Sequence, residues 1–229
     1  MFLVVLIYTV HRERGRTVKK RLKCLFNIFI VLLAFLGAFA VGGNELRHLI
    51  SSSYYFFSPQ STNKVMSYET DIEEELKKHD IVSLTPVLMT IMYQESRGEG
   101  KDPMQASESA GLKRNEIRDP HFSIQQGVDH FYQMYTLGNE YDVDMDTIIQ
   151  SYNMGPGYIY YVAKNGFKHN ENLAKEYSEI QVIRNPKLYT CGEFKGNFRY
   201  PYCFGDYTYA TKVKEEIPTM VKRLKSSGK

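Results

Sequence analysis

Cysteine and histidine are scarce in this chain of 229 residues, which contains three of the former and six of the latter. The histidines are scattered, no HExxH motif is present, and no cysteine pair has the spacing of a zinc site. The sequence also has no GxSxG motif and no phosphate-binding glycine loop. We therefore expect no metal and no cofactor, and the absences argue against zinc-dependent, serine-hydrolase and nucleotide-dependent chemistry.

A basic patch is also missing from most of the chain. The formal net charge of +3 comes from the N-terminus, where residues 11–23 hold seven Lys or Arg and one Glu. Without these, the 29 basic and 26 acidic residues of the chain fall to 22 and 25, a net charge of −3. No stripe of Lys or Arg with interleaved aromatics occurs in this remainder, so we expect no nucleic-acid partner.

One apolar run lies near the N-terminus. Residues 24–43 are apolar apart from Asn27 and are long enough to cross a bilayer as a helix. The basic cluster before the run predicts a cytoplasmic N-terminus over 1–23, with everything after the run outside the cell. We expect a transmembrane signal-anchor, which makes the membrane a partner of the chain. The letters AFA resemble a signal-peptidase site, so cleavage near Ala40 and secretion is the alternative.

The three cysteines fall on both sides of this membrane segment. Cys24 lies at its cytoplasmic edge, while Cys191 and Cys203 fall in the part expected outside the cell, where disulfides persist. A cysteine nucleophile would need a base, and no histidine follows Cys191. We therefore expect Cys191 and Cys203 to form a disulfide, worth about 3 kcal/mol on the chain-entropy model.

Apolar periodicity predicts a mainly helical domain with one core over residues 67–229, preceded by an aperiodic stalk over 44–66. Helices are expected over 68–81, from Thr85 as N-cap, from Ser123 as N-cap to Gly138, and from Asp144 or Asp146 to a break at 155–157. The segment after Gln181 is crowded with Tyr, Phe, Gly and Pro, which predicts an irregular, disulfide-pinned loop or small hairpin. The last residues predict a closing surface helix or an exposed tail.

Glu95 occupies the apolar stripe of the helix that ends before Gly98. Leu88, Ile91 and Met92 mark this stripe at spacings of three and four residues. Glu95 is the next position on it. A buried glutamate would have a raised pKa and would stay protonated near neutral pH, which suits a general acid. The alternative is a solvated glutamate at a frayed helix end.

Two further polar stretches follow Glu95 in the sequence. The loop KDPMQASESAG supplies a second carboxylate and several hydrogen-bonding groups, namely Asp102, Gln105, Ser107, Glu108 and Ser109. The stretch SYNMGPG places Tyr152 and Asn153 at a helix end before a Gly-Pro-Gly break, where a ligand can approach closely. Each stretch has a plainer interpretation, since the first could be an ordinary polar loop and the second a turn with a core tyrosine.

Four ordered motifs resemble those of the goose-type lysozyme and lytic transglycosylase superfamily. They are Glu-Ser at the end of an apolar helix, DPMQASES, an IxxGVxxF helix made by Ile124, Gly127, Val128 and Phe131, and SYNMGPG. Within that superfamily the likeness is to the CwlT-like lysozyme domain family of Gram-positive conjugative elements, and it runs from about Ser67 to Lys175. Four motifs in the same order and spacing are far more specific than any one of them.

The resemblance implies a helical lysozyme-like fold and an enzyme that cuts the β-1,4 bond between N-acetylmuramic acid and N-acetylglucosamine in peptidoglycan. By motif, Glu95 corresponds to the general acid and Asp102 to a proposed second carboxylate. The positions that would contact the glycan strand are Gln105, Ser107, Glu108, Ser109, Tyr152 and Asn153. The expected function is a membrane-anchored muramidase outside the cell, with peptidoglycan strands as substrate and a conjugation or cell-wall machinery as a further partner.

Two alternatives stay open at this point. A lytic transglycosylase shares the general acid but needs no second carboxylate, because a hydroxyl of the sugar itself attacks the anomeric carbon. Asp102 would then be a helix-capping or loop residue. A non-catalytic wall-binding protein would keep the cleft without turnover, although a sugar-binding groove gains nothing from burying an acid such as Glu95.

Overall fold

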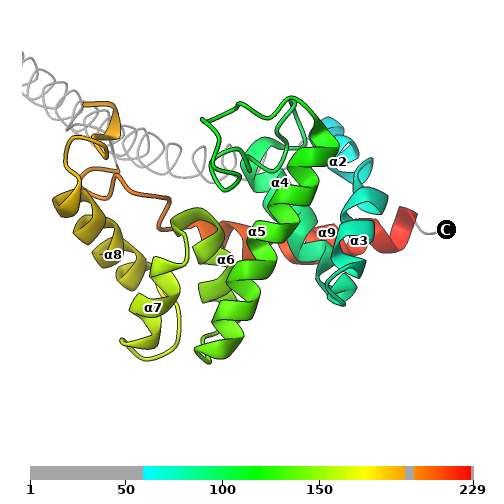
Figure 1. Cartoon of the computed structure of the whole chain (residues 1–229). Coiled ribbons are helices and arrows are strands. Elements are labelled where there is room, and N and C mark those ends of the chain that lie inside the picture. Colours follow the sequence, from blue (N-terminus) through cyan, green and yellow to red (C-terminus); the bar gives the residue numbers. More distant parts are fainter. Residues whose placement is uncertain (1–58, 194–198, 228–229) are drawn as a thin grey trace, which may run out of the picture. The chain divides into compact units, whose positions relative to one another are not determined.

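The computed structural model describes residues 59–193 and 199–227, which form helices joined by loops (Figure 1). The elements in chain order are α2 (Pro59–Met66), α3 (Glu69–Lys77), the 3-10 helix η1 (Val82–Leu84), α4 (Thr85–Ser96), α5 (Pro120–Glu140), α6 (Met145–Met154), α7 (Gly157–Ala163), α8 (Glu171–Arg184), η2 (Cys191–Glu193) and α9 (Tyr209–Ser227). No strand occurs in the two described ranges, so the prediction of a mainly helical domain is confirmed.

The segments predicted to lie before the domain fall largely outside the described residues. These are the cytoplasmic segment 1–23, the signal-anchor 24–43 and most of the stalk 44–66. The helix α2 begins inside the stalk range and packs against α4, with Val65 fully buried. Within the part of the chain that the structure describes, no helix has both the length and the apolar character needed to cross a membrane.

Two helices begin differently from the predicted N-caps. Thr85 is the first residue of α4 and makes no side-chain cap. The N-cap of α5 is Asp119 rather than Ser123, and its carboxylate accepts a hydrogen bond from the backbone N–H of His121. Pro120 is the first residue of the helix, where its fixed φ angle suits the helical backbone. Asp144 caps α6 as predicted, by accepting a backbone hydrogen bond from the first turn of that helix.

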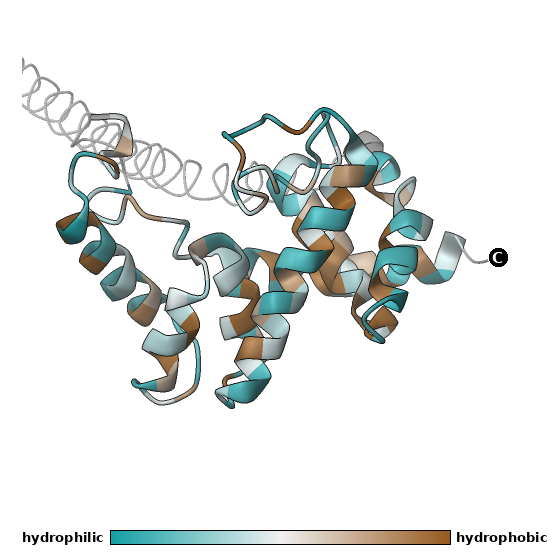
Figure 2. Cartoon of the chain, in the orientation of Figure 1, coloured by the Kyte–Doolittle hydropathy of each residue, from teal (hydrophilic) through white to brown (hydrophobic). Residues whose placement is uncertain are grey.

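The helix α4 is central to the core. Every residue from Val87 to Tyr93 is buried, because α2, α3 and α9 all pack against this helix. The helices α5 and α6 pack against each other, and α6 also contacts α7 and α9. Figure 2 shows hydrophobic residues gathered on the helix faces that turn toward one another. A polar group in the last turn of α4 is therefore partly withdrawn from bulk water, and Glu95 lies in that turn.

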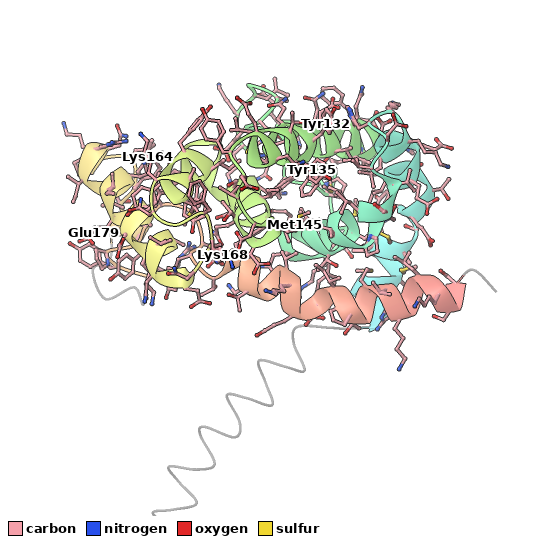
Figure 3. All side chains as sticks on the ribbon, turned by 90° about the horizontal axis from the view of Figure 1, so that it is seen from below. Tyr132, Tyr135, Met145, Lys164, Lys168 and Glu179 are labelled. Atoms are coloured by element: carbon pink, nitrogen blue, oxygen red, sulfur yellow. A yellow bond between two sulfur atoms is a disulfide. The ribbon has the colours of Figure 1, made fainter. Side chains whose placement is uncertain are left out.

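The C-terminal helix α9 closes the core. It packs mainly against α4 and α6, and it buries Tyr209, Ala210, Val213 and Met220. Figure 3 shows the helix running beside the others, with long polar side chains on its outer side. The prediction of a closing surface helix is confirmed, and the alternative of an exposed tail is wrong.

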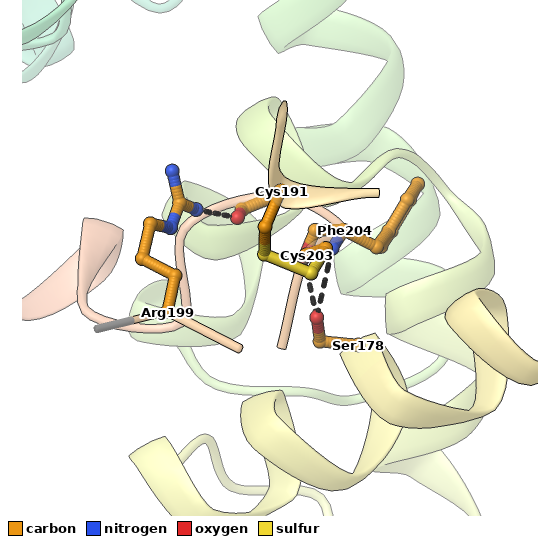
Figure 4. The surroundings of a disulfide bond; sticks show 6 residues. Ser178, Cys191, Arg199, Cys203 and Phe204 are labelled. Carbon is orange, nitrogen blue, oxygen red and sulfur yellow. Dashed lines mark hydrogen bonds between the residues drawn. A yellow bond between two sulfur atoms is a disulfide. The ribbon is translucent and has the colours of Figure 1, made fainter. Parts of the chain in front are cut away.

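The predicted disulfide is present in the irregular segment between α8 and α9. Cys191 and Cys203 are bonded, with their Cα atoms 5.0 Å apart. The bridge is followed directly by Phe204, whose backbone N–H donates to the hydroxyl oxygen of Ser178 and whose carbonyl accepts from the same hydroxyl (Figure 4). These bonds fix residues 203–204 against α8 and so position the residues that lead into α9.

Candidate active site

Glu95 is partly buried at the end of α4. Arg97 and Gly98, which follow the last helical residue Ser96, have φ angles of 59° and 77° and turn the chain away from the helix. A Cβ on Gly98 would lie 3.1 Å from the backbone nitrogen of Val65, so a glycine suits both the left-handed turn and the close approach of α2. Glu95 therefore sits at a well-defined helix end, facing the space that the following loop encloses.

The pKa of Glu95 is raised from 4.5 to about 7, chiefly because burial disfavours the carboxylate. Two neighbours act in the opposite direction: a hydrogen bond from Tyr209 and the positive charge of Arg114 both lower this pKa. The negative charges of Asp102 and Asp206 raise it further, to a smaller extent. Near neutral pH the side chain is thus divided between its acid and its carboxylate form, which is the property of a group that donates and then regains a proton.

A pocket of about 360 Å³ lies beside Glu95. Its wall combines the end of α4 with the loop after it, α5, the end of α6 and the segment before α9. Its other lining residues are Gln105, Ala106, Glu108, Ser109, Arg114, His130, Tyr152, Asn153, Met154, Gly155 and Phe204. Of the residues singled out in the sequence, Asp102 and Ser107 are not among them.

Asp102 lies beneath the pocket loop and is 5% exposed. Its Oδ1 accepts hydrogen bonds from the Ala106 backbone at 2.9 Å and the Ser123 hydroxyl at 2.6 Å. Its Oδ2 accepts from the backbone and the hydroxyl of Ser107, at 3.1 Å and 2.6 Å. A carboxylate has about four acceptor positions, and four donors already occupy them here. The geometry is that of a carboxylate that holds the loop onto α5.

Ser107 extends the same network. Its hydroxyl oxygen accepts hydrogen bonds from the backbone N–H groups of Glu116 and Ile117, both at 3.0 Å. The side chain is 1% exposed and so cannot line a binding surface. Together Asp102 and Ser107 fix both ends of the loop whose tip carries Glu108 and Ser109 into the pocket.

The remaining predicted loop residues do reach the pocket. Gln105 adopts a positive φ of 49°, and one N–H of its side-chain amide donates to the Asp102 carbonyl, so the amide oxygen and the second N–H are available to a ligand. The hydroxyl of Ser109 donates to the Ala106 carbonyl at 2.8 Å. Glu108 is exposed and lines the pocket with Glu95.

Tyr152 and Asn153 both line the pocket, and each also holds a piece of backbone in place. The Tyr152 hydroxyl donates to the Met104 carbonyl at 2.9 Å. The amide oxygen of Asn153 accepts from the backbone N–H of Asp206 at 2.6 Å, so its amide nitrogen is the part that can donate to a ligand. The pair therefore ties α6 to the loop on one side and to the C-terminal segment on the other.

Tyr209 is a site residue that the sequence analysis missed. Its hydroxyl donates to Oε1 of Glu95 at 2.6 Å, and its ring lies nearly parallel to that of Tyr152, with centroids 6.5 Å apart. Burial raises the pKa of Tyr209 well above its ordinary value, so the hydroxyl stays a neutral donor. Residues 95 and 209 meet only because α9 packs on α4, and no local pattern in the sequence connects them.

His130 and Arg114 were also missed. The Nε2 of His130 lies 3.1 Å from the Tyr152 carbonyl, which can only accept, so this nitrogen carries the hydrogen. Burial lowers the pKa of His130, which keeps the ring neutral. Arg114 lies on the exposed part of the loop and brings a positive charge to the pocket. Among the described residues, no group of three or more His, Cys, Asp or Glu side chains is placed to hold a metal ion.

Comparison with known proteins adds independent information. A family model described as Lysozyme-like matches residues 62–217. The uncharacterized membrane protein YocA of Bacillus subtilis (strain 168) is 56% identical over 161 residues, which cover 70% of this chain and 72% of YocA. The bifunctional muramidase/DL-endopeptidase CwlT of the same organism is 34% identical over 121 residues, but these cover 53% of this chain and only 36% of CwlT.

A solved structure is similar as well. A Staphylococcus aureus protein described as similar to a lipoprotein of the NLP/P60 family superposes with a TM-score of 0.59 and 31% sequence identity. The match covers 68% of this chain and 53% of the staphylococcal one, so this chain spans about half the length of that relative. The family model covers most of the described helices and includes Glu95 and every other residue that lines the pocket. On this evidence the chain belongs to the lysozyme-like family.

Proposed function

We propose that the chain is a peptidoglycan glycosidase that cleaves the β-1,4 bond between N-acetylmuramic acid and N-acetylglucosamine, with Glu95 as the general acid. The observation that carries the proposal is a partly buried glutamate with a pKa of about 7 in a polar pocket of a lysozyme-like domain. The name of the relative CwlT, a muramidase, supports the same substrate class. A pocket that merely bound sugars would gain nothing from this burial.

The hydrogen bonds of Glu95 suggest how the proton is delivered. Tyr209 donates to Oε1, so Oε2 is the oxygen left to carry the acidic proton. Transfer of that proton to the glycosidic oxygen lets the leaving sugar depart as an alcohol, while positive charge develops at the anomeric carbon. The carboxylate formed on Glu95 is stabilised by the Tyr209 hydrogen bond and by the charge of Arg114, both of which favour the ionised form.

We propose hydrolysis as the outcome, with Glu108 rather than Asp102 as the second carboxylate. Hydrolysis needs a group that activates water, and the four hydrogen bonds accepted by Asp102 leave it no acceptor position for that water. Glu108 is exposed and lines the pocket with Glu95. Asp102 has a positioning role in this proposal, because it holds the loop that carries Glu108.

A lytic transglycosylase is the second candidate, and the geometry of Asp102 is the observation that favours it. Such an enzyme needs only one acid, which first protonates the leaving group and then accepts the proton of the attacking sugar hydroxyl. Glu95 can fill both roles. The two reactions release different products, so product mass distinguishes them.

We further propose that the domain acts outside the cell, anchored by residues 24–43 and preceded by the cytoplasmic segment 1–23. The basic cluster before the apolar run supports this orientation. The relative YocA is named as a membrane protein, which supports the same location. Secretion after cleavage near Ala40 is the alternative, and the N-terminal sequence of the mature protein separates the two.

Zymography tests the proposed activity. The purified full-length chain and its Glu95→Gln variant are run in a gel that contains peptidoglycan and are then refolded. We expect a cleared band from the parent and none from the variant, since a glutamine cannot donate the proton. Equal clearing by both would rule out Glu95 as the acid, and clearing by neither would point to a wall-binding protein.

A further inference from the structure

Arg114 is a cation in the pocket whose charge favours the Glu95 carboxylate, but the proposed reaction uses none of the N–H donors of its guanidinium group. It is exposed, it lines the pocket with Glu95, and its charge reaches Glu95. Within residues 59–193 and 199–227, no hydrogen bond or ion pair holds its guanidinium group. By contrast, Lys212 and Lys214 each pair with an aspartate at 2.7 Å and 2.5 Å. A guanidinium group at a pocket mouth presents five N–H donors to whatever enters.

The backbone on both sides of Arg114 is hydrogen-bonded to Ser107, although the Arg114 side chain is exposed. The backbone N–H of Leu112 donates to the Ser107 carbonyl at 2.9 Å, which closes the turn on one side of Arg114. On the other side, the Ser107 hydroxyl accepts from the backbone of Glu116, and the Glu116 carboxylate accepts from the N–H of Lys113 at 2.7 Å. Residues on both sides of Arg114 are thus tied to Ser107, which belongs to the same network as Asp102.

Peptidoglycan, the substrate class of the proposed function, carries carboxylates that match the guanidinium group of Arg114. A chain of N-acetylglucosamine alone is uncharged. A muramic acid residue adds a lactyl ether that ends either in a carboxylate or in a stem peptide, which carries carboxylates of its own. A guanidinium group matches a carboxylate with two parallel hydrogen bonds. Glu95 is largely protonated below pH 7 and so does not oppose an anion bound beside it.

We propose that Arg114 forms a carboxylate-binding subsite that takes the lactyl or stem-peptide carboxylate of a muramic acid residue. The subsite would make the pocket prefer muramic-acid glycans over neutral chitin chains. This inference rests on the proposed function for the identity of the ligand, but binding can be measured without turnover.

The test measures equilibrium binding by calorimetry, with the full-length chain in a Glu95→Gln background that cannot cleave the ligand. Three soluble glycans of equal length are compared: a peptide-free strand with lactyl carboxylates, the same strand with stem peptides, and a neutral chitin oligomer. Arg114→Gln is expected to weaken binding of a muramic-acid strand about fivefold and to leave the chitin oligomer within twofold of the parent. Arg114→Lys keeps the charge but loses the two parallel N–H donors, so its affinity for the muramic-acid strand should lie between those of the parent and Arg114→Gln.

Lys113→Gln is the matched control. It removes a positive charge from the adjacent residue, which does not line the pocket, and it should change none of the three affinities. If Arg114→Gln loses affinity for the peptide-free strand, the lactyl carboxylate is the group that Arg114 binds. If it loses affinity only for the peptide-bearing strand, the bound group is a carboxylate of the stem peptide.

Three results would overturn the subsite: an equal loss for all three glycans, no loss for either muramic-acid strand, or the same loss from Lys113→Gln. The proposed function fails by a different route. If the parent shows Arg114-dependent binding but releases no product from peptidoglycan, the subsite stands and the glycosidase proposal falls.

Discussion

At the scale of single residues, Glu95 shows how burial and hydrogen bonding oppose each other in one side chain. Burial raises its pKa, while the Tyr209 hydroxyl and the Arg114 charge lower it, and the balance falls at about 7. Burial alone would favour a permanently neutral acid, which could not give up its proton to form the carboxylate. The two opposing neighbours therefore matter to the site although burial has the larger effect, because a catalytic acid must be stable in both forms.

The raised pKa makes a prediction about stability as well as activity. Because the pKa of Glu95 is 4.5 in the unfolded chain and about 7 in the folded one, the folded state binds more protons between these pH values. The contribution of Glu95 to stability is thus fully present below pH 4.5 and is lost as pH rises through 7. We expect Glu95→Gln to be more stable than the parent at pH 8, by about 1–2 kcal/mol, and similar to it at pH 4.5.

Thermal melting of both proteins at the two pH values checks this prediction. Glu108→Gln is the control, since it removes an exposed carboxylate from the same pocket and should give no such gain at pH 8. A Glu95→Gln variant that is less stable than the parent at pH 8 would mean that the carboxylate is not destabilised by burial.

Tyr209→Phe tests the hydrogen bond that lowers the pKa of Glu95. The hydroxyl of Tyr209 lowers the pKa of Glu95, so its removal should raise that pKa and move the alkaline limb of the pH–rate profile to higher pH. The rate should also fall roughly tenfold, because Oε1 loses the bond that orients it. Tyr207→Phe is the control from the same segment, since its ring packs near Tyr202 and Lys175, outside the pocket. An unchanged pH profile in Tyr209→Phe would contradict this role.

At the scale of elements, the loop between α4 and α5 is held by buried polar groups as well as by apolar packing. Asp102 joins this loop to α5 through Ser123, and Met104 lies against Gly127 of the same helix. A Cβ at Gly127 would lie 2.6 Å from the Cβ of Met104, so the approach depends on glycine at that position. The DPMQASES loop and the IxxGVxxF helix are therefore linked by two contacts, the bond of Asp102 to Ser123 and the packing of Met104 on Gly127.

Asp102→Asn should therefore damage the loop before it affects any chemical step. The amide nitrogen of asparagine would face donors that now bind a carboxylate oxygen, which we expect to cost about 2 kcal/mol and several degrees of melting temperature. Asp119→Asn is the control, because asparagine is as good an N-cap as aspartate for α5. Full stability of Asp102→Asn together with a large loss of rate would restore a direct chemical role for Asp102.

The sequence predicted individual helices better than their contacts. The apolar stripe that ends at Glu95 and the disulfide of Cys191 with Cys203 were both visible locally and are present in the structure. The N-cap at Ser123 was wrong because Asp119 caps α5 four residues earlier, and the Ser123 hydroxyl instead joins the Asp102 network, a tertiary interaction that no local pattern reports. Tyr209 could not be predicted for the same reason, since it lies 114 residues away from its partner in the sequence.

At the scale of the whole molecule, the pocket depends on segments from both ends of the domain. Gln150 of α6 donates to the Asp206 carbonyl at 2.7 Å and accepts from the Ala210 backbone at 3.0 Å, which fixes the start of α9. Phe204 reaches the pocket just after the disulfide at Cys203. The C-terminal segment is thus part of the site wall, and the placement of Tyr209 on Glu95 follows from the docking of this whole segment.

The products released from peptidoglycan give the last prediction, because they report which nucleophile the assembled pocket admits. With Glu108 as the group that activates water, we expect muropeptides that end in reducing sugars, and we expect Glu108→Gln to slow their release about a hundredfold without lowering the melting temperature. Mass spectrometry of the products, with Glu99→Gln as a control from the same loop outside the pocket, checks both statements. If the products are instead lighter by one water and Glu108→Gln is as active as the parent, Glu95 acts alone and the chain is a lytic transglycosylase, since a sugar hydroxyl then replaces water without any second carboxylate.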